Sequence, residues 1–280
     1  MQKNCAAFHD LSCYAKSSLT VVLPVLEVMG IEACPVPTAL LSSQTDGFDT
    51  YYFQDTTTAF FSILDTWESL GLSFDSIYSG FLGSEKQGER IIRFVQNQRK
   101  KSSPLVLIDP VLGDEHQLYG PITEAQVEAM RSLVCCADVI TPNATEAALL
   151  LKEPFQQSFS EKQALQWAGK LSLQTGAMTA ITSVSLAHGH VVACCNKEKS
   201  FLVGYEQIPV AYPGSGDLFA SLLLGNLLGK ASFQSSVEQA VYMTSLAIER
   251  TKNAKMERRH GVAVTSILRE LAQQRGAHGS

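Results

Sequence analysis

The sequence predicts an α/β fold with a central, mostly parallel sheet and helices on both faces. Short β-rich runs alternate with amphipathic segments of helical length as far as Ser183. Repeated strand–helix–strand units of this kind are typical of a parallel sheet covered on both sides. Of the 280 residues, 45% are hydrophobic, and no long linker or change of composition divides the chain. We therefore predict one domain over residues 1–280.

The first half of the chain contains four strand–helix units. The run "PLVLIDP" is uniformly apolar before its aspartate and predicts a strand buried on both faces. The second strand contains two prolines, which weaken its assignment. Two of the helices begin with polar residues and end at a glycine, as helices often do. In chain order the predicted strands are 4–8, 34–43, 76–81 and 104–110, and the helices are 18–30, 55–71, 84–101 and 123–137.

The second half begins with the same alternation of strands and helices, which then gives way to antiparallel strands and three consecutive helices. Strands are predicted at 138–143 and 178–183, with helices at 144–151 and 160–176. Residues 188–210 predict two or three antiparallel strands with turns at 188–190 and 196–199, and three helices follow at 214–229, 234–251 and 262–275. The polar and aromatic residues 46–58 have no clear period. They predict either a flap over a site or an ordinary loop.

Composition excludes several classes of protein. The net charge is −5 and the basic residues form no long stripe, which argues against a nucleic-acid partner. Seven cysteines, an odd number without any CxxC spacing, fit buried thiols in a reducing compartment better than disulfides or zinc. The chain shows neither a signal peptide nor an apolar run of the roughly 20 residues that span a membrane. We therefore expect a soluble, cytoplasmic protein.

Two motifs follow predicted strands. In "DPVLGD", Asp109 lies at the carboxyl end of a buried strand, where a carboxylate can bind Mg²⁺ directly or through water. Capping of a turn is the alternative for Asp109. In "TPNATE", Asn143 and Glu146 are spaced as a helix capping box, and the same spacing places both on one face of the helix. Capping and a role in organising metal-bound water are compatible.

A third motif, "GSGD", precedes an apolar helix. Gly214 and Gly216 allow successive N–H groups to point into one concavity, and the following helix adds the positive end of its dipole. A phosphate would bind there. Asp217 then has two interpretations: it caps the helix, or it takes a proton from a hydroxyl that attacks phosphorus.

Three other patterns are rejected. "GNLLGKAS" has three residues between its glycines where a P-loop has four, and it lies at the end of a helix. "GSGDLF" has Phe219 at the third glycine position of a dinucleotide fingerprint. His188 and His190 could bind a metal, but solvent-facing histidines at a turn are the simpler interpretation.

With these motifs, the chain resembles the ribokinase-like superfamily, and within it the pyridoxal (vitamin B6) kinase branch. The resemblance rests on "DPVLGD", "PNATE" and "GSGDLFAS", with weaker matches near the N-terminus and at "SGFLGSEKQGE". It implies a three-layer α/β domain, commonly a homodimer, that transfers the ATP γ-phosphate to the hydroxymethyl group of pyridoxal, pyridoxine or pyridoxamine. It also implies Mg²⁺ as cofactor, often with a monovalent cation such as K⁺.

The resemblance also implies roles for particular residues. Asp217 would be the catalytic base, and it would also contact the substrate. The other implied roles are an anion hole at Gly214, Ser215 and Gly216, ATP and Mg²⁺ contacts at Asp109, Asn143, Glu146, Thr182 and Ser183, and a pyridine pocket at Asp10, Ser12 and Thr45. Asp109 and Glu146 would contact the metal partly through water.

One departure from the family pattern concerns the substrate side. Many relatives have a glycine-containing turn before the first helix, where this chain has Tyr14 and Lys16 in "CYAKSS". The departure affects the substrate pocket and leaves the phosphoryl chemistry intact. Alternative functions are hydroxymethylpyrimidine kinase, a sugar kinase and a non-catalytic ligand-binding relative. The "LGD" ending of "DPVLGD" favours the B6 branch, and Asp217 argues against loss of catalysis.

Overall fold

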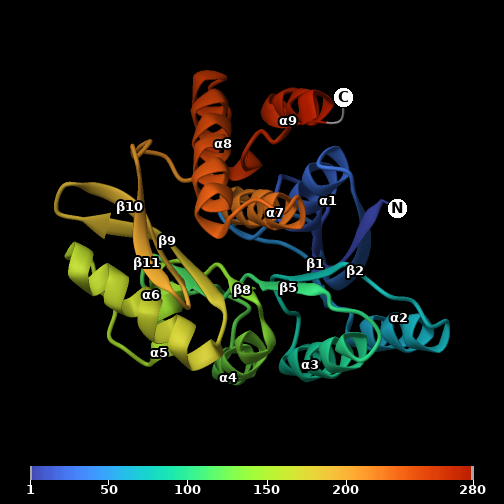
Figure 1. The fold of residues 1–280 in the computed structure, drawn as a ribbon. Helices are drawn as coiled ribbons and strands as arrows, with labels where there is room; N and C mark the ends of the chain where they lie inside the picture. The colour runs from blue at the N-terminus through green and yellow to red at the C-terminus, as the bar shows by residue number, and fades with distance from the viewer. Residues whose placement is uncertain (1, 279–280) are drawn as a thin grey trace.

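The computed structural model describes residues 2–278 and centres on a nine-stranded sheet (Figure 1). Five neighbouring pairs, from β2–β1 across to β8–β9, are parallel, and antiparallel strands complete both edges. The strand order is β11-β10-β9-β8-β5-β4-β1-β2-β3. The strands are β1 (Lys3–Ser12), β2 (Ile31–Leu41), β3 (Phe53–Asp55), β4 (Ser76–Ser79), β5 (Leu105–Ile108), β8 (Val139–Ile140), β9 (Met178–Leu186), β10 (Gly189–Asn196) and β11 (Lys199–Tyr205).

Helices cover both faces of this sheet and make three layers (Figure 1). One face packs against α2 (Thr57–Ser69), α3 (Glu85–Arg99), α4 (Glu124–Leu133), α5 (Ala144–Leu151) and α6 (Glu161–Thr175). The other packs against α1 (Leu19–Val28), α7 (Ser215–Leu228), α8 (Phe233–Asn253) and α9 (Thr265–His278). None of the helices within residues 2–278 combines the length and apolarity needed to cross a lipid bilayer.

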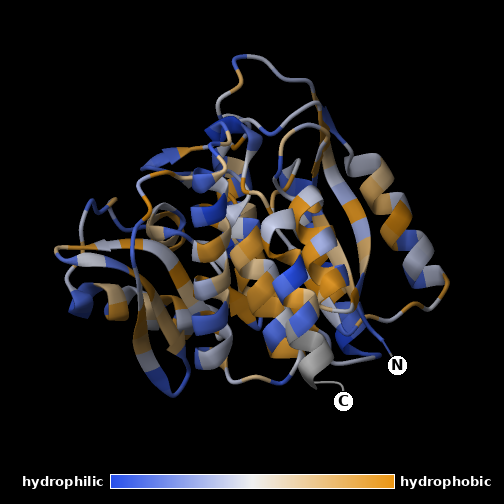
Figure 2. Ribbon diagram, turned by 90° about the horizontal axis from the view of Figure 1, so that it is seen from above, coloured by the Kyte–Doolittle hydropathy of each residue, from blue (hydrophilic) through white to orange (hydrophobic). Residues whose placement is uncertain are grey.

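Alternation along the strands divides the core between the two faces. In β1, Ala6 and Phe8 pack on the side of α2 and α3, whereas Cys5 and Ala7 pack on the side of α1 and α7. Helix α7 is buried along most of its length because it lies between the sheet and α8. Figure 2 shows apolar residues concentrated in the central elements. This arrangement confirms the predicted three-layer α/β fold.

The predicted second strand forms despite its two prolines. Residues 31–41 of β2 pair in parallel with β1, but on the other side β3 pairs only with Ala39 to Leu41. Pro35 and Pro37 therefore lie where β2 is the edge of the sheet. A missing N–H group at an open edge removes no ladder hydrogen bond.

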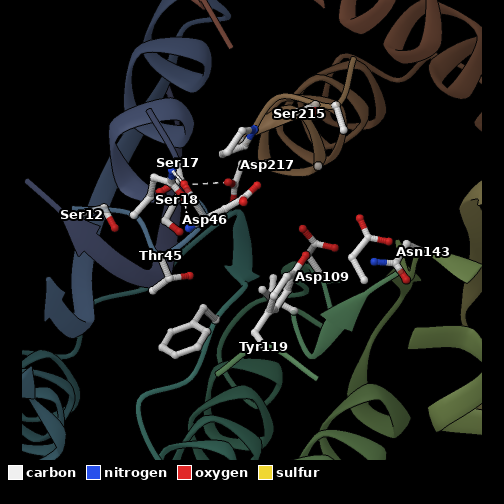
Figure 3. Close-up of a pocket in the computed structure, with 18 of the residues that line it drawn as sticks. Ser12, Ser17, Ser18, Thr45, Asp46, Asp109, Tyr119, Asn143, Ser215 and Asp217 are labelled. Carbon is white, nitrogen blue, oxygen red and sulfur yellow. Dashed lines mark hydrogen bonds between the residues drawn. The ribbon is translucent and has the colours of Figure 1, made fainter. Parts of the chain in front are cut away.

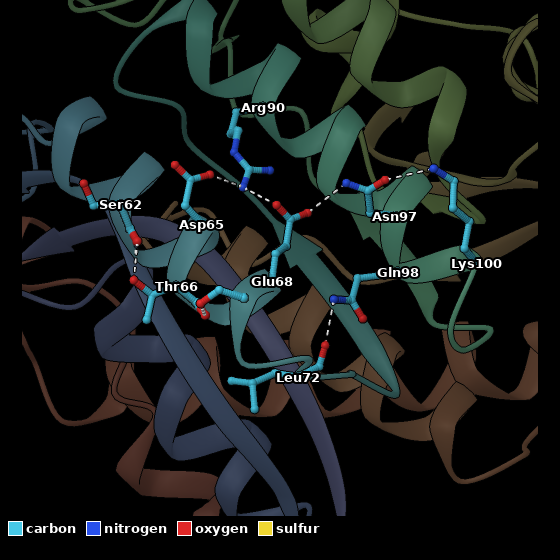
Figure 4. Close-up of polar contacts among 10 residues, drawn as sticks. Ser62, Asp65, Thr66, Glu68, Leu72, Arg90, Asn97, Gln98 and Lys100 are labelled. Atoms are coloured by element: carbon cyan, nitrogen blue, oxygen red, sulfur yellow. Dashed lines mark hydrogen bonds and ion pairs between the residues drawn. The ribbon is translucent and has the colours of Figure 1, made fainter.

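Helices α2 and α3 are joined by a buried arginine (Figure 4). The Arg90 guanidinium, with 6% of its side chain exposed, contacts Asp65 at 2.8 Å and Glu68 at 2.7 Å. Asn97 donates a further hydrogen bond to Glu68 at 3.0 Å. These contacts tie the two helices together on the face of the sheet away from α7.

Two segments differ from the sequence expectation. Of residues 46–58, treated as one flap or loop, Phe53–Asp55 forms edge strand β3 and Thr57 begins α2, so the irregular part is 46–52. A short hairpin after β5, formed by β6 (Gly113–Asp114) and β7 (Gln117–Leu118), was not predicted. Its strands have two residues each, too few to produce an alternating pattern in the sequence.

Candidate active site

A cavity of about 670 Å³ lies at the carboxyl ends of the parallel strands. Loops that follow parallel strands meet at one edge of the sheet, which is where ligands bind in such folds. All of the residues that the sequence singled out for binding or catalysis line this one cavity. They are Asp10, Ser12, Thr45, Asp109, Asn143, Glu146, Thr182, Ser183, Gly214, Ser215, Gly216 and Asp217.

The N-terminus of α7 opens into this cavity without a side-chain cap. Its N-cap residue, Gly214, has φ 82°, a conformation that favours glycine, and a Cβ atom there would lie 2.6 Å from the carbonyl oxygen of Lys16. None of the described side chains caps the helix. The first N–H groups of α7 can therefore bind an anion, assisted by the helix dipole.

Asp217 is the third residue of α7 and is buried beside this N-terminus. Its Oδ2 atom accepts a hydrogen bond of 2.7 Å from the backbone N–H of Ser18, in the turn before α1 (Figure 3). The carboxylate therefore does not cap its own helix. Burial, and secondly the negative charge of Asp109, raises the pKa of Asp217 to about 8.

Asp109 follows β5 and is also buried. Its Oδ1 atom accepts a hydrogen bond of 2.9 Å from the hydroxyl of Thr141, at the end of neighbouring strand β8. Burial raises the pKa of Asp109 to about 7. A cation bound in the cavity would offset this cost and favour the ionised form.

Asn143 and Glu146 form the capping box that their spacing predicted. The Asn143 side chain accepts from the N–H of Glu146 at 2.9 Å, and Glu146 accepts from the N–H of Asn143 at 2.8 Å. The other Glu146 oxygen accepts from the N–H of Leu112 at 3.1 Å. Glu146 thus ties the loop after Asp109 to α5. Burial, and secondly Asp109, raises its pKa.

A fourth buried carboxylate lines the cavity near the end of β1. Asp10, at the end of β1, accepts hydrogen bonds from the hydroxyls of Ser12, at 2.8 Å, and Ser18. Thr45 and Tyr119 line the same space (Figure 3). Burial raises the pKa of Asp10, an effect that the two hydroxyls reduce.

Tyr14 and Lys16, where the chain departs from the family pattern, lie outside the cavity lining. The Tyr14 side chain is exposed and contacts His260, while Lys16 contributes backbone contacts to that same segment near the C-terminus. Ala15 and Ser18 have positive φ angles there, 68° and 50°.

Sequence reasoning missed several residues of the site. Ser18 was missed because its contact with Asp217 joins residues 199 apart in the chain. Arg258 lines the cavity and makes a two-point ion pair with Asp46 at 2.6 and 2.8 Å, joining the segment 46–52 to the C-terminal region. The short basic run "ERRHG" that contains Arg258 gives no sequence signal of a binding site. His9, which is buried beside Asp217, was also missed.

The cavity lining is strongly acidic. Its one basic side chain among the described residues is Arg258, against seven carboxylates: Asp10, Asp46, Asp109, Asp114, Glu115, Glu146 and Asp217. No group of three or more His, Cys, Asp or Glu side chains within residues 2–278 is arranged to hold a metal ion by itself. A divalent cation would therefore need further ligands from water or from an anionic ligand, as is usual for Mg²⁺.

Comparison with known proteins identifies the family. The sequence profile of phosphomethylpyrimidine kinase matches residues 22–263. The chain belongs to the phosphomethylpyrimidine kinase family. It is 30% identical over 251 residues to pyridoxine/pyridoxal/pyridoxamine kinase of Bordetella avium, which covers 84% of this chain and 83% of that protein.

Solved structures of family relatives have the same fold. Pyridoxal kinase of Lactobacillus plantarum superposes with a TM-score of 0.90 at 30% identity, covering 99% of each chain. A Bacteroides thetaiotaomicron protein, assigned as a phosphomethylpyrimidine kinase and determined with pyridoxal, superposes with a TM-score of 0.92 at 34% identity, covering 97% of this chain and 96% of that one. The ribokinase-like resemblance found from the motifs is confirmed.

Proposed function

We propose that this protein is a pyridoxal kinase, which transfers the γ-phosphoryl group of ATP to the hydroxymethyl group of pyridoxal, pyridoxine or pyridoxamine. One observation carries the proposal: Asp217 is buried between an uncapped helix N-terminus and a separate polar pocket at Asp10, within one cavity. Base, phosphate site and acceptor site are thus adjacent. Relatives at 30% identity named as kinases of these vitamers support the same conclusion.

In the proposed mechanism, Asp217 accepts the proton of the hydroxymethyl group as its oxygen attacks the γ-phosphorus. The new O–P bond forms while the bond to the β–γ bridging oxygen breaks, and ADP leaves. The N–H groups at Gly214 and Gly216, with that of Ser215, whose bond to the Tyr212 carbonyl is long at 3.3 Å, hold the charge that develops on the phosphoryl oxygens. The Ser18 N–H fixes one oxygen of the base, so that its other oxygen can take the proton.

The acidic lining makes a cation necessary. Seven carboxylates and one arginine cannot accommodate a triphosphate without added positive charge. Asp109 and Glu146 fit Mg²⁺, because both are buried carboxylates with raised pKa values at the phosphate end of the cavity. Bound Mg²⁺ would neutralise charge on the triphosphate. We also propose that K⁺ activates the enzyme.

We assign the nucleotide side of the cavity to residues that follow β8 and to residues in the middle of β9. The N–H of Thr182 donates to the carbonyl of Pro142 at 2.8 Å, which holds it beside Asn143. Ser183 has φ 57°, an uncommon conformation for a residue with a side chain and one that is frequent at functional sites. We assign Asn143, Thr182 and Ser183 to nucleotide binding.

The pyridine ring is assigned to the pocket at Asp10, Ser12 and Thr45. Residues 46–52 lie beside this pocket and are joined to the C-terminal region through Asp46 and Arg258. We propose that they close as a flap that excludes water from the transferring phosphoryl group.

The proposal also covers the oligomeric state of the protein and its location in the cell. We propose a homodimer, testable by sedimentation at several protein concentrations. We also propose a cytoplasmic location, because the described chain has seven free cysteines, and free thiols persist in reducing compartments.

The second candidate, hydroxymethylpyrimidine kinase, is favoured by the family profile itself. Its substrate is also a flat heteroaromatic ring with a hydroxymethyl group. A test of both is ATP consumption by purified protein with each B6 vitamer, hydroxymethylpyrimidine and ribose, and Asp217→Asn as the control protein. Turnover confined to the vitamers supports the proposal. Turnover confined to hydroxymethylpyrimidine or ribose contradicts it, and no turnover with any of them indicates a non-catalytic relative.

A further inference from the structure

His9 lies directly behind the proposed catalytic base. It belongs to β1, and its side chain is completely buried. Its Nδ1 atom is 3.8 Å from Oδ1 of Asp217, the oxygen that Ser18 leaves free. The two oxygens of the base are thus faced by two different donor groups, one from the turn before α1 and one from β1.

The imidazole ring has little freedom to move. It packs edge-to-face against Tyr78, with ring centroids 4.3 Å apart. On another side it contacts Gly80, where a Cβ atom would lie only 2.3 Å from Nδ1 and 2.6 Å from Cε1 of His9. Residue 80 must therefore be glycine for the ring to occupy this position. A ring held in this way presents its Nδ1 edge to Asp217 in a fixed orientation.

Both ring nitrogens of His9 are buried without a hydrogen-bond partner among the described residues. Burial lowers the pKa of His9 to about 3, so the ring is neutral and carries one N–H group. An unpaired buried polar group destabilises a fold, and an apolar side chain of this size would avoid that cost. A histidine whose only role was packing would be expected to have its nitrogens paired.

We propose that His9 is a positioning residue for Asp217, donating a hydrogen bond from Nδ1–H to Oδ1 when nucleotide and acceptor fill the cavity. At 3.8 Å the two atoms are too far apart for a hydrogen bond. Contacts of this kind are often long in free enzymes and shorten in the substrate complex.

This inference rests on the proposed function and adds a second hydrogen bond that orients the Asp217 carboxylate. With Ser18 N–H on Oδ2 and His9 on Oδ1, the plane of the carboxylate is set, and a free lone pair of Oδ1 faces the acceptor hydroxyl. The other ionisable groups whose charges act on Asp217 are Asp10 on β1 and Asp109 after β5. Neither can donate when ionised, so His9 supplies the hydrogen bond that they cannot.

The test uses variants that restore one ring nitrogen at a time. The amide nitrogen of His9→Asn reaches the place of Nδ1, whereas that of His9→Gln reaches the place of Nε2. We expect His9→Phe and His9→Gln to lower kcat by about tenfold or more, the usual effect of losing a hydrogen bond to a charged group, with little change in KM for ATP. We expect His9→Asn to retain most of kcat. The matched control is Tyr78→Phe, which removes a buried hydroxyl that has no hydrogen-bond partner among the described residues from the ring that packs against His9, and which should leave kcat unchanged.

Equal losses in His9→Asn and His9→Gln, or the same loss in Tyr78→Phe, would overturn the inference, because each indicates a packing effect. A measurement on the unmodified protein covers the case in which the variants do not fold. Nitrogen-15 NMR of labelled histidine should show His9 as the Nδ1–H tautomer, and the Nε2–H tautomer would refute the proposal. Absence of turnover in the unmodified protein would instead contradict the proposed function, so the two failures are distinguishable.

Discussion

Replacement of Asp217 by asparagine distinguishes a catalytic role of this side chain from a structural one. The side chain makes one hydrogen bond, from the Ser18 N–H to Oδ2, and it does not cap α7. The amide oxygen of asparagine can accept the same bond with almost the same shape. It cannot take a proton from a hydroxyl group. We therefore expect a folded protein whose turnover is lower by about 10²–10⁴-fold.

The same substitution should stabilise the free protein. Burial raises the pKa of Asp217 from 3.8 to about 8. The folded state therefore binds this proton more tightly than the unfolded state, and the carboxyl group lowers the free energy of unfolding as the pH rises from about 4 to about 8. At 1.36 kcal/mol for each pKa unit, the loss approaches ~4 kcal/mol at pH 7. Asparagine does not titrate, so the variant avoids this loss of stability and its Tm at pH 7 should be higher by several degrees.

The assay is turnover, nucleotide affinity and Tm on one preparation of Asp217→Asn and of the unmodified protein, with Tm measured between pH 5 and 8. ATP affinity should persist at pH 7, where Asp217 of the free protein is mostly protonated, and should increase slightly above pH 8, where the substitution removes a negative charge near the triphosphate. The stability difference should grow as the pH rises. Near-normal turnover would refute the role of Asp217 as the base, and a fall in Tm that is independent of pH would refute the electrostatic argument.

Three further predictions concern the metal, the flap and the scaffold. Glu146→Gln should raise the Mg²⁺ concentration needed for half-maximal activity and cost about 1–3 kcal/mol of stability, because one of two backbone N–H donors loses its acceptor; an unchanged Mg²⁺ titration would leave only a structural role. Amide hydrogen exchange in residues 46–52 should slow when nucleotide and vitamer bind together, and slow, ligand-independent exchange would contradict a flap. Arg90→Ala should lower stability by roughly 1–3 kcal/mol without loss of kcat, whereas the control Arg99→Ala, which breaks a half-exposed ion pair, should cost less than about 1 kcal/mol. Equal Tm changes in the two arginine variants would count against the buried network.

Most of the fold follows from local patterns. The apolar run before Asp109, and the capping box at Asn143 and Glu146, each mark the junction of a strand or helix with a loop. Such signals depend on neighbouring residues, and sequence alone is enough to detect them. Strand β2 shows the limit: its prolines argue against a strand, and only the pairing of its neighbours reveals that they lie at an open edge.

The chemistry-bearing residues of the site were also detectable, because alternating strands and helices require that loops after parallel strands meet. That argument singled out Asp109, whereas Asp10 came from the family resemblance, and both line one cavity with Asp217 in the structure. It could not predict the hairpin at Gly113–Leu118, which closes one wall with strands of two residues. It also could not predict that Arg258 lies at the mouth of the cavity, opposite Asp46.

The sequence by itself determined the three-layer architecture, the edge of the sheet that carries the site and the residue types available for phosphoryl transfer, because periodicity, turns and helix caps are local properties. Only the tertiary structure determined the burial, the hydrogen-bond partners and the pKa of each carboxylate. That Asp217 does not cap its own helix follows only from its contact with the N–H of Ser18, 199 residues away. His9 looked like any strand residue until Gly80 was seen to make room for its ring beside Asp217. Burial and long-range contacts set the pKa and orientation of a side chain, and both arise only when distant segments pack together.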